Sequence, residues 1–460
     1  MKKTLGKNIE KNESYITEIT DINHEGQGVG RINGMAVFVD GALIGERVEV
    51  KLIKVLKNYA IGKIIQIRNT SSDRVEPFCS TYKHCGGCGL QHMSYESQLK
   101  FKTNLVRETL KRIGKIEDAL IQNTIGMESP FNYRNKVQYP VGLLNGKPVV
   151  GYYAKRSHDV VGIESCGIQD FIGNKVREIF ERFIRDNNIS VYDEIKHRGL
   201  IRHLIVRTGF KTKEVMVIVV VNGRFLPGKE LFVNSLLNEV PTIKSIVLNI
   251  NTSKTNVILG NQNIKIYGKD TITDYIGKFK FRISPLSFFQ INPVQTEVLY
   301  NKALEFAGLT GNETVFDLYC GTGTISLFMA QKARQVYGVE VVEDAVLDAR
   351  KNAKDNGVEN VEFIAGGVEK VIPELYSQGV KAEVVVVDPP RKGCDTSLLD
   401  TIVEIGPKRI VYVSCNPSTL ARDLMYLEEK GYKAVEVQPV DMFPWTGHVE
   451  CVTLMSRVKK

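Results

Sequence analysis

Residues 281–460 repeat one pattern, an apolar strand followed by a glycine turn and a helix, and this repeat constrains the fold more than any other feature. The apolar run Val315–Leu318 leads through Gly321-Thr322-Gly323 into a stretch with helical periodicity. Further strand-like runs follow at Val336–Glu340 and Val384–Val387. Because strands that alternate with helices form parallel sheets, the pattern predicts a Rossmann-like α/β domain over residues 281–460.

Acidic residues end two of these predicted strands. Glu340 ends the second strand, 23 residues after Asp317, a spacing that suits a carboxylate bound to ribose hydroxyls. Asp388 ends the third strand and is followed by Pro389-Pro390. The glycine turn does not follow the G-x-G-x-x-G pattern of dinucleotide sites. Together these features indicate a site for S-adenosylmethionine.

A cysteine follows the next predicted strand. Ile410–Val413 ends in Ser414-Cys415-Asn416-Pro417, and ligands of open α/β sheets bind at the carboxyl ends of strands. A thiol there, before a proline that stops the strand, is typical of a presented nucleophile; a buried core cysteine is the alternative. Glu450 stands before the last apolar strand, Val452–Met455, and is the candidate for a second catalytic group.

Four cysteines form a separate candidate site. Cys79, Cys85 and Cys88 follow the spacing C-x5-C-x2-C among glycines, and Cys166 stands alone in a cysteine-free span. The chain shows no apolar signal segment and no apolar run that could span a bilayer, which predicts a cytoplasmic protein without membrane association. In that reducing compartment, four thiols favour a metal site, either a [4Fe–4S] cluster or structural zinc.

The front of the chain divides into two further regions. Residues 15–70 contain five short strand-like runs between glycine turns, which predicts a small OB-like β-barrel after a flexible segment 1–14. Residues 75–280 are expected to form an α+β domain that carries the cysteines. In it, Ser94 is expected to cap a helix that ends near Ile113, and Phe171–Asn187 to form another. Ile246–Asn251 is expected to pair with Asn256–Leu259 in antiparallel strands.

Charge is distributed unevenly between front and back. Residues 1–280 hold 42 of the 61 Lys and Arg but only 28 of the 52 Asp and Glu. This surplus indicates that the front contacts a polyanion, with a generally basic surface as the alternative. OB-like barrels often bind nucleic acid, so RNA is the expected partner. The candidates for phosphate contacts in the α+β domain are Arg134, Lys136, Arg198, Arg202, His203 and Arg207.

In combination, these motifs resemble the RNA (uracil-5-)-methyltransferase family, in its iron–sulfur branch that acts on 23S rRNA. The barrel resembles a TRAM domain, an RNA-binding module, in its turns at residues 26–31 and 41–46. The resemblance covers nearly the whole chain. Besides the cysteines, it rests on Phe289-Gln290-Ile291-Asn292, Asp317-Leu318-Tyr319-Cys320-Gly321, Asp388-Pro389-Pro390-Arg391, Ser414-Cys415-Asn416-Pro417 and His448-Val449-Glu450.

The resemblance implies a class I methyltransferase fold and S-adenosylmethionine-dependent methylation of uridine C5 in RNA. It implies that Cys415 is the nucleophile and Glu450 the base. The cofactor site would be lined by Gln290, Tyr319, Glu340 and Asp388, although the family often has Phe where Tyr319 stands. A [4Fe–4S] cluster would be held by Cys79, Cys85, Cys88 and Cys166.

Two other functions compete with this hypothesis. One is the same chemistry on tRNA, and the other is a non-catalytic iron–sulfur RNA-binding protein with a decayed methyltransferase domain. The intact Cys415, Glu450 and Asp388 weigh against decay. A third alternative, a zinc-stabilised cytosine or amino-group methyltransferase, is disfavoured by Arg391 after the two prolines, where amino-group methyltransferases place an aromatic residue. We expect the protein to be a monomer.

Overall fold

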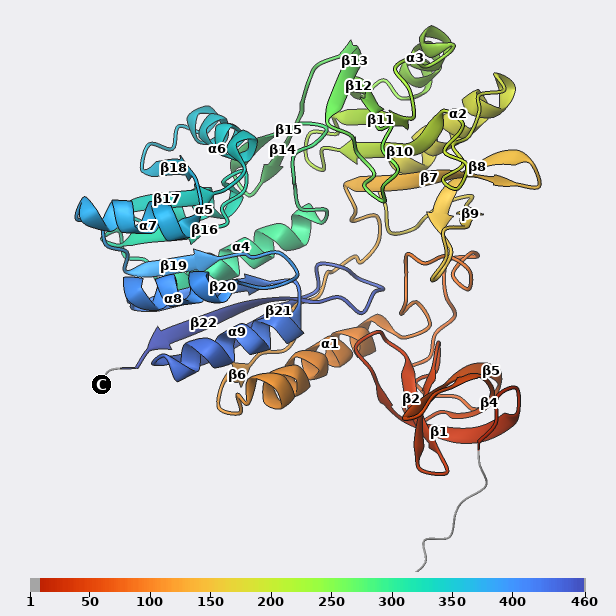
Figure 1. The fold of residues 1–460 in the computed structure, drawn as a ribbon, viewed down its shortest axis with the longest axis horizontal. Helices are drawn as coiled ribbons and strands as arrows, with labels where there is room; N and C mark the ends of the chain where they lie inside the picture. Colours follow the sequence, from red (N-terminus) through yellow and green to blue (C-terminus); the bar gives the residue numbers. More distant parts are fainter. Residues whose placement is uncertain (1–8, 459–460) are drawn as a thin grey trace, which may run out of the picture.

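The computed structural model describes residues 9–458 and shows three parts: an N-terminal barrel, a central α+β domain and a C-terminal α/β domain (Figure 1). Residues 1–8 of the predicted flexible segment 1–14 lie outside the described residues. Between residues 9 and 458, no helix is both long and apolar enough to cross a bilayer.

The predicted five-stranded barrel is confirmed. Its strands close in the order β1-β2-β3-β5-β4. Alternate side chains such as Val48, Val50 and Leu52 point into the barrel, as expected for strands with one buried face. The strands are β1 (Ser14–Ile22), β2 (Gly28–Ile32), β3 (Met35–Val39), β4 (Arg47–Val55) and β5 (Tyr59–Asn69).

The central domain is a seven-stranded sheet in the order β13-β12-β11-β10-β7-β8-β9, with β11 and β12 parallel and the other neighbours antiparallel. Its helices α2 (Phe171–Asp186) and α3 (Lys229–Glu239) pack against the sheet through a common apolar core. The strands are β7 (Lys136–Leu144), β8 (Lys147–Tyr153), β9 (Val160–Gly162), β10 (Ile201–Thr208), β11 (Val215–Val221), β12 (Ile243–Ile250) and β13 (Gln262–Gly268).

One predicted strand in this domain is wrong. β12 does pair antiparallel, but its partner is Gln262–Gly268 and not Asn256–Leu259. The Asn251 side chain donates to the carbonyls of Val257 and Ile258 at 2.7 and 2.9 Å, which holds that stretch as a loop. A hairpin of β14 (Ile272–Ile276) and β15 (Phe279–Ile283) then leads into the C-terminal domain.

The C-terminal domain is a mostly parallel sheet in the order β18-β17-β16-β19-β20-β22-β21-β6, as the strand–turn–helix repeat predicts. Alternate valines of one strand face opposite cores: Val384 and Val386 face α4 to α6, whereas Val385 and Val387 face α7 to α9. The strands are β16 (Thr314–Leu318), β17 (Gln335–Glu340), β18 (Val361–Ala365), β19 (Val384–Val387), β20 (Arg409–Ser414), β21 (Tyr432–Val440), β22 (Glu450–Arg457) and β6 (Leu120–Ile121). The helices are α4 (Pro293–Ala307), α5 (Thr324–Ala330), α6 (Glu343–Asp355), α7 (Val368–Ser377), α8 (Thr396–Ile405) and α9 (Pro417–Glu429).

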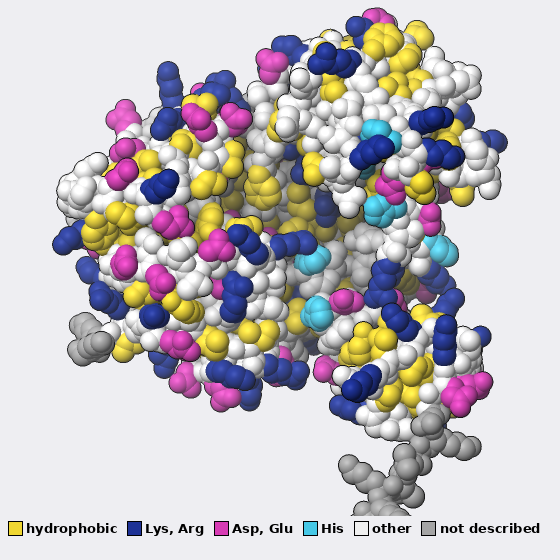
Figure 2. Space-filling model, viewed as in Figure 1, with side chains coloured by type: hydrophobic (Ala, Val, Ile, Leu, Met, Phe, Trp, Pro, Cys, Tyr) yellow, Lys and Arg dark blue, Asp and Glu magenta, His cyan; other side chains and the backbone are white. Residues whose placement is uncertain are grey.

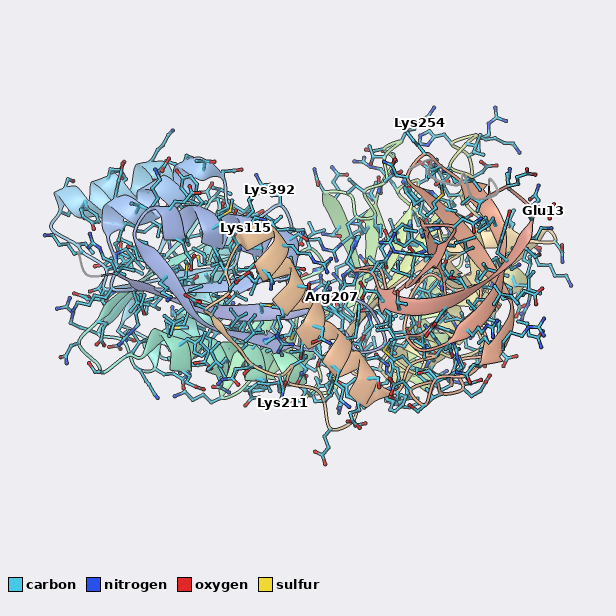
Figure 3. All side chains as sticks on the ribbon, turned by 90° about the horizontal axis from the view of Figure 1, so that it is seen from below. Glu13, Lys115, Arg207, Lys211, Lys254 and Lys392 are labelled. Atoms are coloured by element: carbon cyan, nitrogen blue, oxygen red, sulfur yellow. The ribbon has the colours of Figure 1, made fainter. Side chains whose placement is uncertain are left out.

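An early segment of the chain completes this late domain. Helix α1 (Tyr95–Thr109) begins at the predicted cap Ser94 and continues as the single π-helical turn η1 (Leu110–Gly114). Val106 and Leu110 lie in the same core as α8 and α9, and β6 adds an edge strand parallel to β21. Figure 3 shows α1 crossing from the barrel side to the C-terminal domain, where Lys115 marks its far end.

Candidate active site

The residues predicted to bind and react meet at one edge of the C-terminal sheet. Tyr319 follows β16, Glu340 ends β17, and Asp388 and Cys415 follow β19 and β20. Glu450 is the first residue of β22, which runs antiparallel to β20, so its beginning reaches the same edge. The strand ladder therefore collects side chains that are far apart in the sequence.

These five side chains and Gln290 line one cavity of about 850 Å³. Gln290 comes from the segment between β15 and α4, and its carbonyl accepts a 3.0 Å hydrogen bond from Asn135 Nδ2 of the central domain. The sequence did not indicate roles for Tyr300 and Asp317, which also line the cavity. The signal for Asp317 was available, because it stands one residue before the end of β16 in the quoted motif.

The carboxyl groups of this cavity are poorly hydrated. Burial raises the pKa of Glu450 to about 8; the charge of Asp388 raises it further, and Arg391 opposes the shift. Burial also raises the pKa of Asp388 to about 7, with a further contribution from Asp317. A carboxyl group that titrates near neutral pH can act as a general acid or base there.

Cys415 stands between β20 and α9, and Asn416 caps that helix with its side chain. Burial raises the pKa of the Cys415 thiol, the charges of Glu450 and Asp388 raise it further, and Arg391 lowers it. When both carboxyl groups are protonated they no longer oppose the thiolate, and the guanidinium favours it.

The glycine turn lines the same cavity through Gly321 and Thr322. Gly321 N–H donates to Glu340 Oε2 at 3.2 Å, and Val342 N–H donates to Oε1 at 2.9 Å, so the carboxylate is held at the strand end. Asp317 Oδ2 accepts a 2.5 Å bond from Ser326, whereas its Oδ1 finds no hydrogen-bond partner in residues 9–458. Such an acceptor and a fixed carboxylate suit the donor groups of a nucleoside.

The four predicted cysteines surround a second, smaller cavity of about 250 Å³. Burial raises the pKa of the Cys88 thiol to about 12, and the other three cysteines raise it further. Burial is also the main cause that raises the pKa values of the Cys85 and Cys166 thiols, and neighbouring cysteines contribute. In the described part of the chain, no three Cys, His, Asp or Glu side chains are already arranged to hold a metal ion.

A hollow of about 720 Å³ separates the barrel from the two cavities. Arg391 and His448 line both this hollow and the catalytic cavity, while Arg134, Lys155 and Arg156 line its other side. Figure 2 shows the surface hollowed between the parts of the molecule, with Lys, Arg and His side chains around the opening. A polyanion that entered there would reach the catalytic cavity.

Two of the predicted phosphate contacts are structural instead. Arg202 donates to the carbonyls of Asn251 and Ser253 at 2.8 Å each. Arg207 donates to the carbonyls of Pro285 and Ser287 at 3.2 and 2.8 Å, and Figure 3 places it between the two halves of the molecule. Both guanidinium groups are buried and bound to backbone, so they are not available for phosphate.

Comparisons with known proteins agree with this geometry. A family model for tRNA (uracil-5-)-methyltransferase matches residues 243–458, and a TRAM-domain model matches residues 15–65. A protein described as an uncharacterized RNA methyltransferase from Clostridium tetani is 54% identical over 97% of each chain. Another with that description, from Caldanaerobacter subterraneus, is 56% identical over 97% of this chain and 98% of its own.

One solved structure is similar over almost the whole length. Pyrococcus abyssi tRNA (uracil-54, C5)-methyltransferase, in complex with S-adenosyl-L-homocysteine, matches with a TM-score of 0.76 and 29% identity. The match covers 95% of this chain and 99% of that one.

Proposed function

The chain belongs to the RNA (uracil-5-)-methyltransferase family, whose members depend on S-adenosylmethionine, and we propose that it methylates uridine C5 in 23S rRNA with Cys415 as nucleophile and Glu450 as base. One observation carries the proposed mechanism: the thiol, the buried carboxyl group and the nucleoside-binding edge share a single cavity.

Cys415 would begin the reaction. Uracil C5 is a poor nucleophile. Once the Cys415 thiol has lost its proton to water, the thiolate adds to C6, moves the C5–C6 π electrons towards O4 and leaves an enolate. Bound S-adenosylmethionine supplies the electrophilic methyl group that the activated C5 accepts. Glu340 and Tyr319 would hold the nucleoside part of this cofactor. Gln290 and Asp388, which line the same cavity, would contact both the cofactor and the uracil.

Glu450 would complete the methylation reaction. The base must remove the C5 proton, whose electron pair then re-forms the C5–C6 double bond and expels the Cys415 thiolate. General base catalysis of this kind contributes about 10²–10⁴ in rate. Glu450 must enter this step as the carboxylate; because burial raises its pKa to about 8, it then binds the C5 proton more strongly than an exposed carboxylate would.

The cysteine site would hold a [4Fe–4S] cluster through Cys79, Cys85, Cys88 and Cys166. The residues fit such a group in number and chemistry, because four thiols line one cavity and the other three cysteines, together with burial, raise the pKa of Cys88. A bound cation would relieve that repulsion and favour the thiolates. Its role here would be structural.

The substrate class is the finer part of the proposal. A TRAM domain and the family support RNA as the substrate. The four cysteines support 23S rRNA, through their resemblance to the iron–sulfur branch. The similar P. abyssi enzyme acts on tRNA, which makes tRNA the second candidate. That the protein is a monomer and cytoplasmic stays a prediction.

Tritium release from C5-tritiated uridine tests chemistry and substrate together. Anaerobically purified protein and S-adenosylmethionine would be mixed with unmodified rRNA or tRNA in parallel. We expect release from rRNA alone. Release from tRNA alone would retain the mechanism and overturn the substrate, and release from neither by protein with bound cofactor would overturn the proposed reaction.

A further inference from the structure

Residues 441–449 connect β21 to Glu450 and form one wall of the catalytic cavity through Phe443 and His448. This segment, the base-bearing loop, begins at Asp441. Lys102 Nζ of α1 donates to Asp441 Oδ1 at 2.5 Å and to the Phe443 carbonyl at 3.1 Å, and both members of the ion pair are fully buried. One end of the loop is therefore fixed to α1.

The middle of the loop is fixed to the cysteine segment. The Trp445 carbonyl accepts hydrogen bonds of 3.0 Å from the N–H groups of both Gly89 and Leu90, which directly follow Cys88. Trp445 N–H donates to Gln98 Oε1 at 3.0 Å. The backbone of Trp445 is therefore bound on both sides by the segment that carries three of the four cysteines and by the helix that follows it.

The Trp445 ring extends this link into the cysteine core. It packs among Phe78, Tyr95 and Phe131, with ring centroids 5.1, 5.6 and 5.3 Å away, and its Nε1–H donates to the Pro130 carbonyl at 2.8 Å. The same buried cluster contains Cys88, with Cys79 and Cys166 packed against it. Trp445 is only 6% exposed.

The backbone of Trp445 also needs support. Its φ is +69°, a left-handed conformation that is strained for a large L-residue and persists only where neighbours determine it. Those neighbours are the cysteine segment and α1. Displacement of the cysteine segment would remove the two hydrogen bonds to the Trp445 carbonyl and would weaken this conformation of the loop.

We propose that Trp445 is a positioning residue through which the four-cysteine site sets the position of the base-bearing loop, so that loss of the bound metal group selectively impairs proton removal by Glu450. This inference rests on the proposed function, both for the metal group and for Glu450 as base. Selectivity follows from the fold: Glu450 is the first residue of β22 and directly continues the loop, whereas Cys415 lies between β20 and α9, which the loop does not precede in the chain.

The test separates formation of the covalent protein–RNA adduct from its resolution. Single-turnover reactions with unmodified RNA and S-adenosylmethionine would be stopped in denaturant, and the adduct measured by gel. For Trp445→Ala we expect adduct formation at nearly the parent rate and resolution about 10- to 100-fold slower, as for a small misplacement of a catalytic group. Trp445→Phe retains a ring and should restore most of the resolution rate.

A matched control lies at the far end of the same strand pair. Tyr432 is also a buried aromatic residue, at the end of β21 remote from Glu450. Tyr432→Ala should lower stability without changing the ratio of the two rates. If Trp445→Ala slowed both steps equally, as general destabilisation would, or slowed neither, the positioning role would be wrong.

Metal removal tests whether the four-cysteine site affects the position of Trp445. Trp445 is the only tryptophan of the chain, so its fluorescence reports on this position alone. Treatment of anaerobically purified protein with a metal chelator should increase acrylamide quenching of Trp445 several-fold and slow adduct resolution as Trp445→Ala does. Unchanged quenching, or purified protein without iron or zinc, would overturn the coupling to metal.

Glu450→Gln distinguishes the two proposals. If this variant forms adduct that persists, while Trp445→Ala and the metal-free protein resolve theirs normally, only the coupling fails. If Glu450→Gln itself resolves the adduct at the parent rate, the assignment of the base in the proposed function fails.

Discussion

The catalytic cavity and the four-cysteine cavity are built in opposite ways. In the catalytic cavity, Tyr319, Glu340, Asp388 and Cys415 stand at the carboxyl ends of paired strands, so the ladder of the C-terminal sheet fixes their backbone positions, and Glu450 begins the neighbouring β22. Residues 75–93 contain no helix or strand of the described fold apart from isolated bridges, and Cys166 lies in a connection between β9 and α2. There, single hydrogen bonds hold the backbone, such as that from Cys166 N–H to Asn174 Oδ1 at 2.9 Å.

This difference shows which site depends on its ligand. A sheet edge keeps its geometry without a bound molecule, because every strand is held by its neighbours. The four thiols stand on loops, and burial and the other three cysteines raise the pKa of Cys88; a bound cation would favour the thiolates and stabilise their arrangement. Substitutions at the sheet edge should therefore change the rates of the reaction steps. Substitutions at the cysteine site should change the stability of the fold around it.

Cys415→Ala should have the largest effect on chemistry. Without the thiol, C6 has no nucleophile, so methyl transfer and the covalent adduct should both fall below detection. Binding of S-adenosylhomocysteine, measured by calorimetry, should remain, because Cys415 is not needed to hold the nucleoside. Turnover near the parent rate would remove Cys415 from the mechanism.

Glu450→Gln should allow attack but not completion. The amide cannot accept the C5 proton, so we expect turnover to fall by about 10²–10⁴ while methylated RNA accumulates as a covalent complex with the protein. Mass spectrometry of the complex would detect the added methyl group. Free turnover by this variant would mean that another group takes the proton.

Lys102→Met tests the junction between the two regions. It would leave Asp441 buried without its cation, and breaking such a pair costs about 3–5 kcal/mol of unfolding free energy. Urea denaturation of the full chain would measure the loss. Lys100→Met on the same helix is the matched control, because the Lys100–Glu96 pair is exposed and its removal should change the stability little.

Cys88→Ser should separate the two cavities. We expect loss of the bound metal, measured by elemental analysis, and a lower melting temperature. Affinity for S-adenosylhomocysteine should change by less than about threefold, because distant sites contribute nearly independently. A large loss of cofactor affinity would show that the geometry of the sheet edge depends on the cysteine site.

Local signals account for what the sequence predicted well. Ser94 was recognised as a helix cap, and its hydroxyl accepts a hydrogen bond from Ser97 N–H at 3.3 Å. The helix expected over Phe171–Asn187 is α2, one residue shorter at its end. Glu340, Asp388 and Cys415 could be placed together because the ends of parallel strands share one edge, whereas Gln290 and Tyr319 were assigned through the family resemblance.

Long-range packing accounts for what it did not predict. Nothing local in α1 and β6 shows that they belong to the C-terminal domain. In the structure, β6 is an edge strand of the C-terminal sheet and α1 packs in the core of that domain. Arg202 and Arg207 carry the charge of phosphate contacts, and only the fold reveals the carbonyl groups that bind them. The contact of Trp445 with the cysteine segment is equally invisible in the sequence.

The smallest expected effect concerns the pH dependence of stability. Burial raises the pKa of Glu450 from 4.5 to about 8, so between these values the native state keeps a proton that the unfolded chain has lost. The unfolded state then binds fewer protons, and the free energy of unfolding falls as pH rises from about 4.5 to about 8. Glu450→Gln removes this contribution, so it should raise the melting temperature relative to the parent by a few degrees more at pH 9 than at pH 5.

Calorimetric scans of parent and variant at both pH values would measure this difference, with Glu362→Gln on the exposed face of β18 as the control that should respond equally at both. A Glu450→Gln variant with the same melting-temperature shift at pH 5 and pH 9 would show that water reaches Glu450. The catalytic cavity would then lack the dehydrated interior that distinguishes it from the rest of the sheet edge, and the base would act from solvent instead of from a preorganised wall.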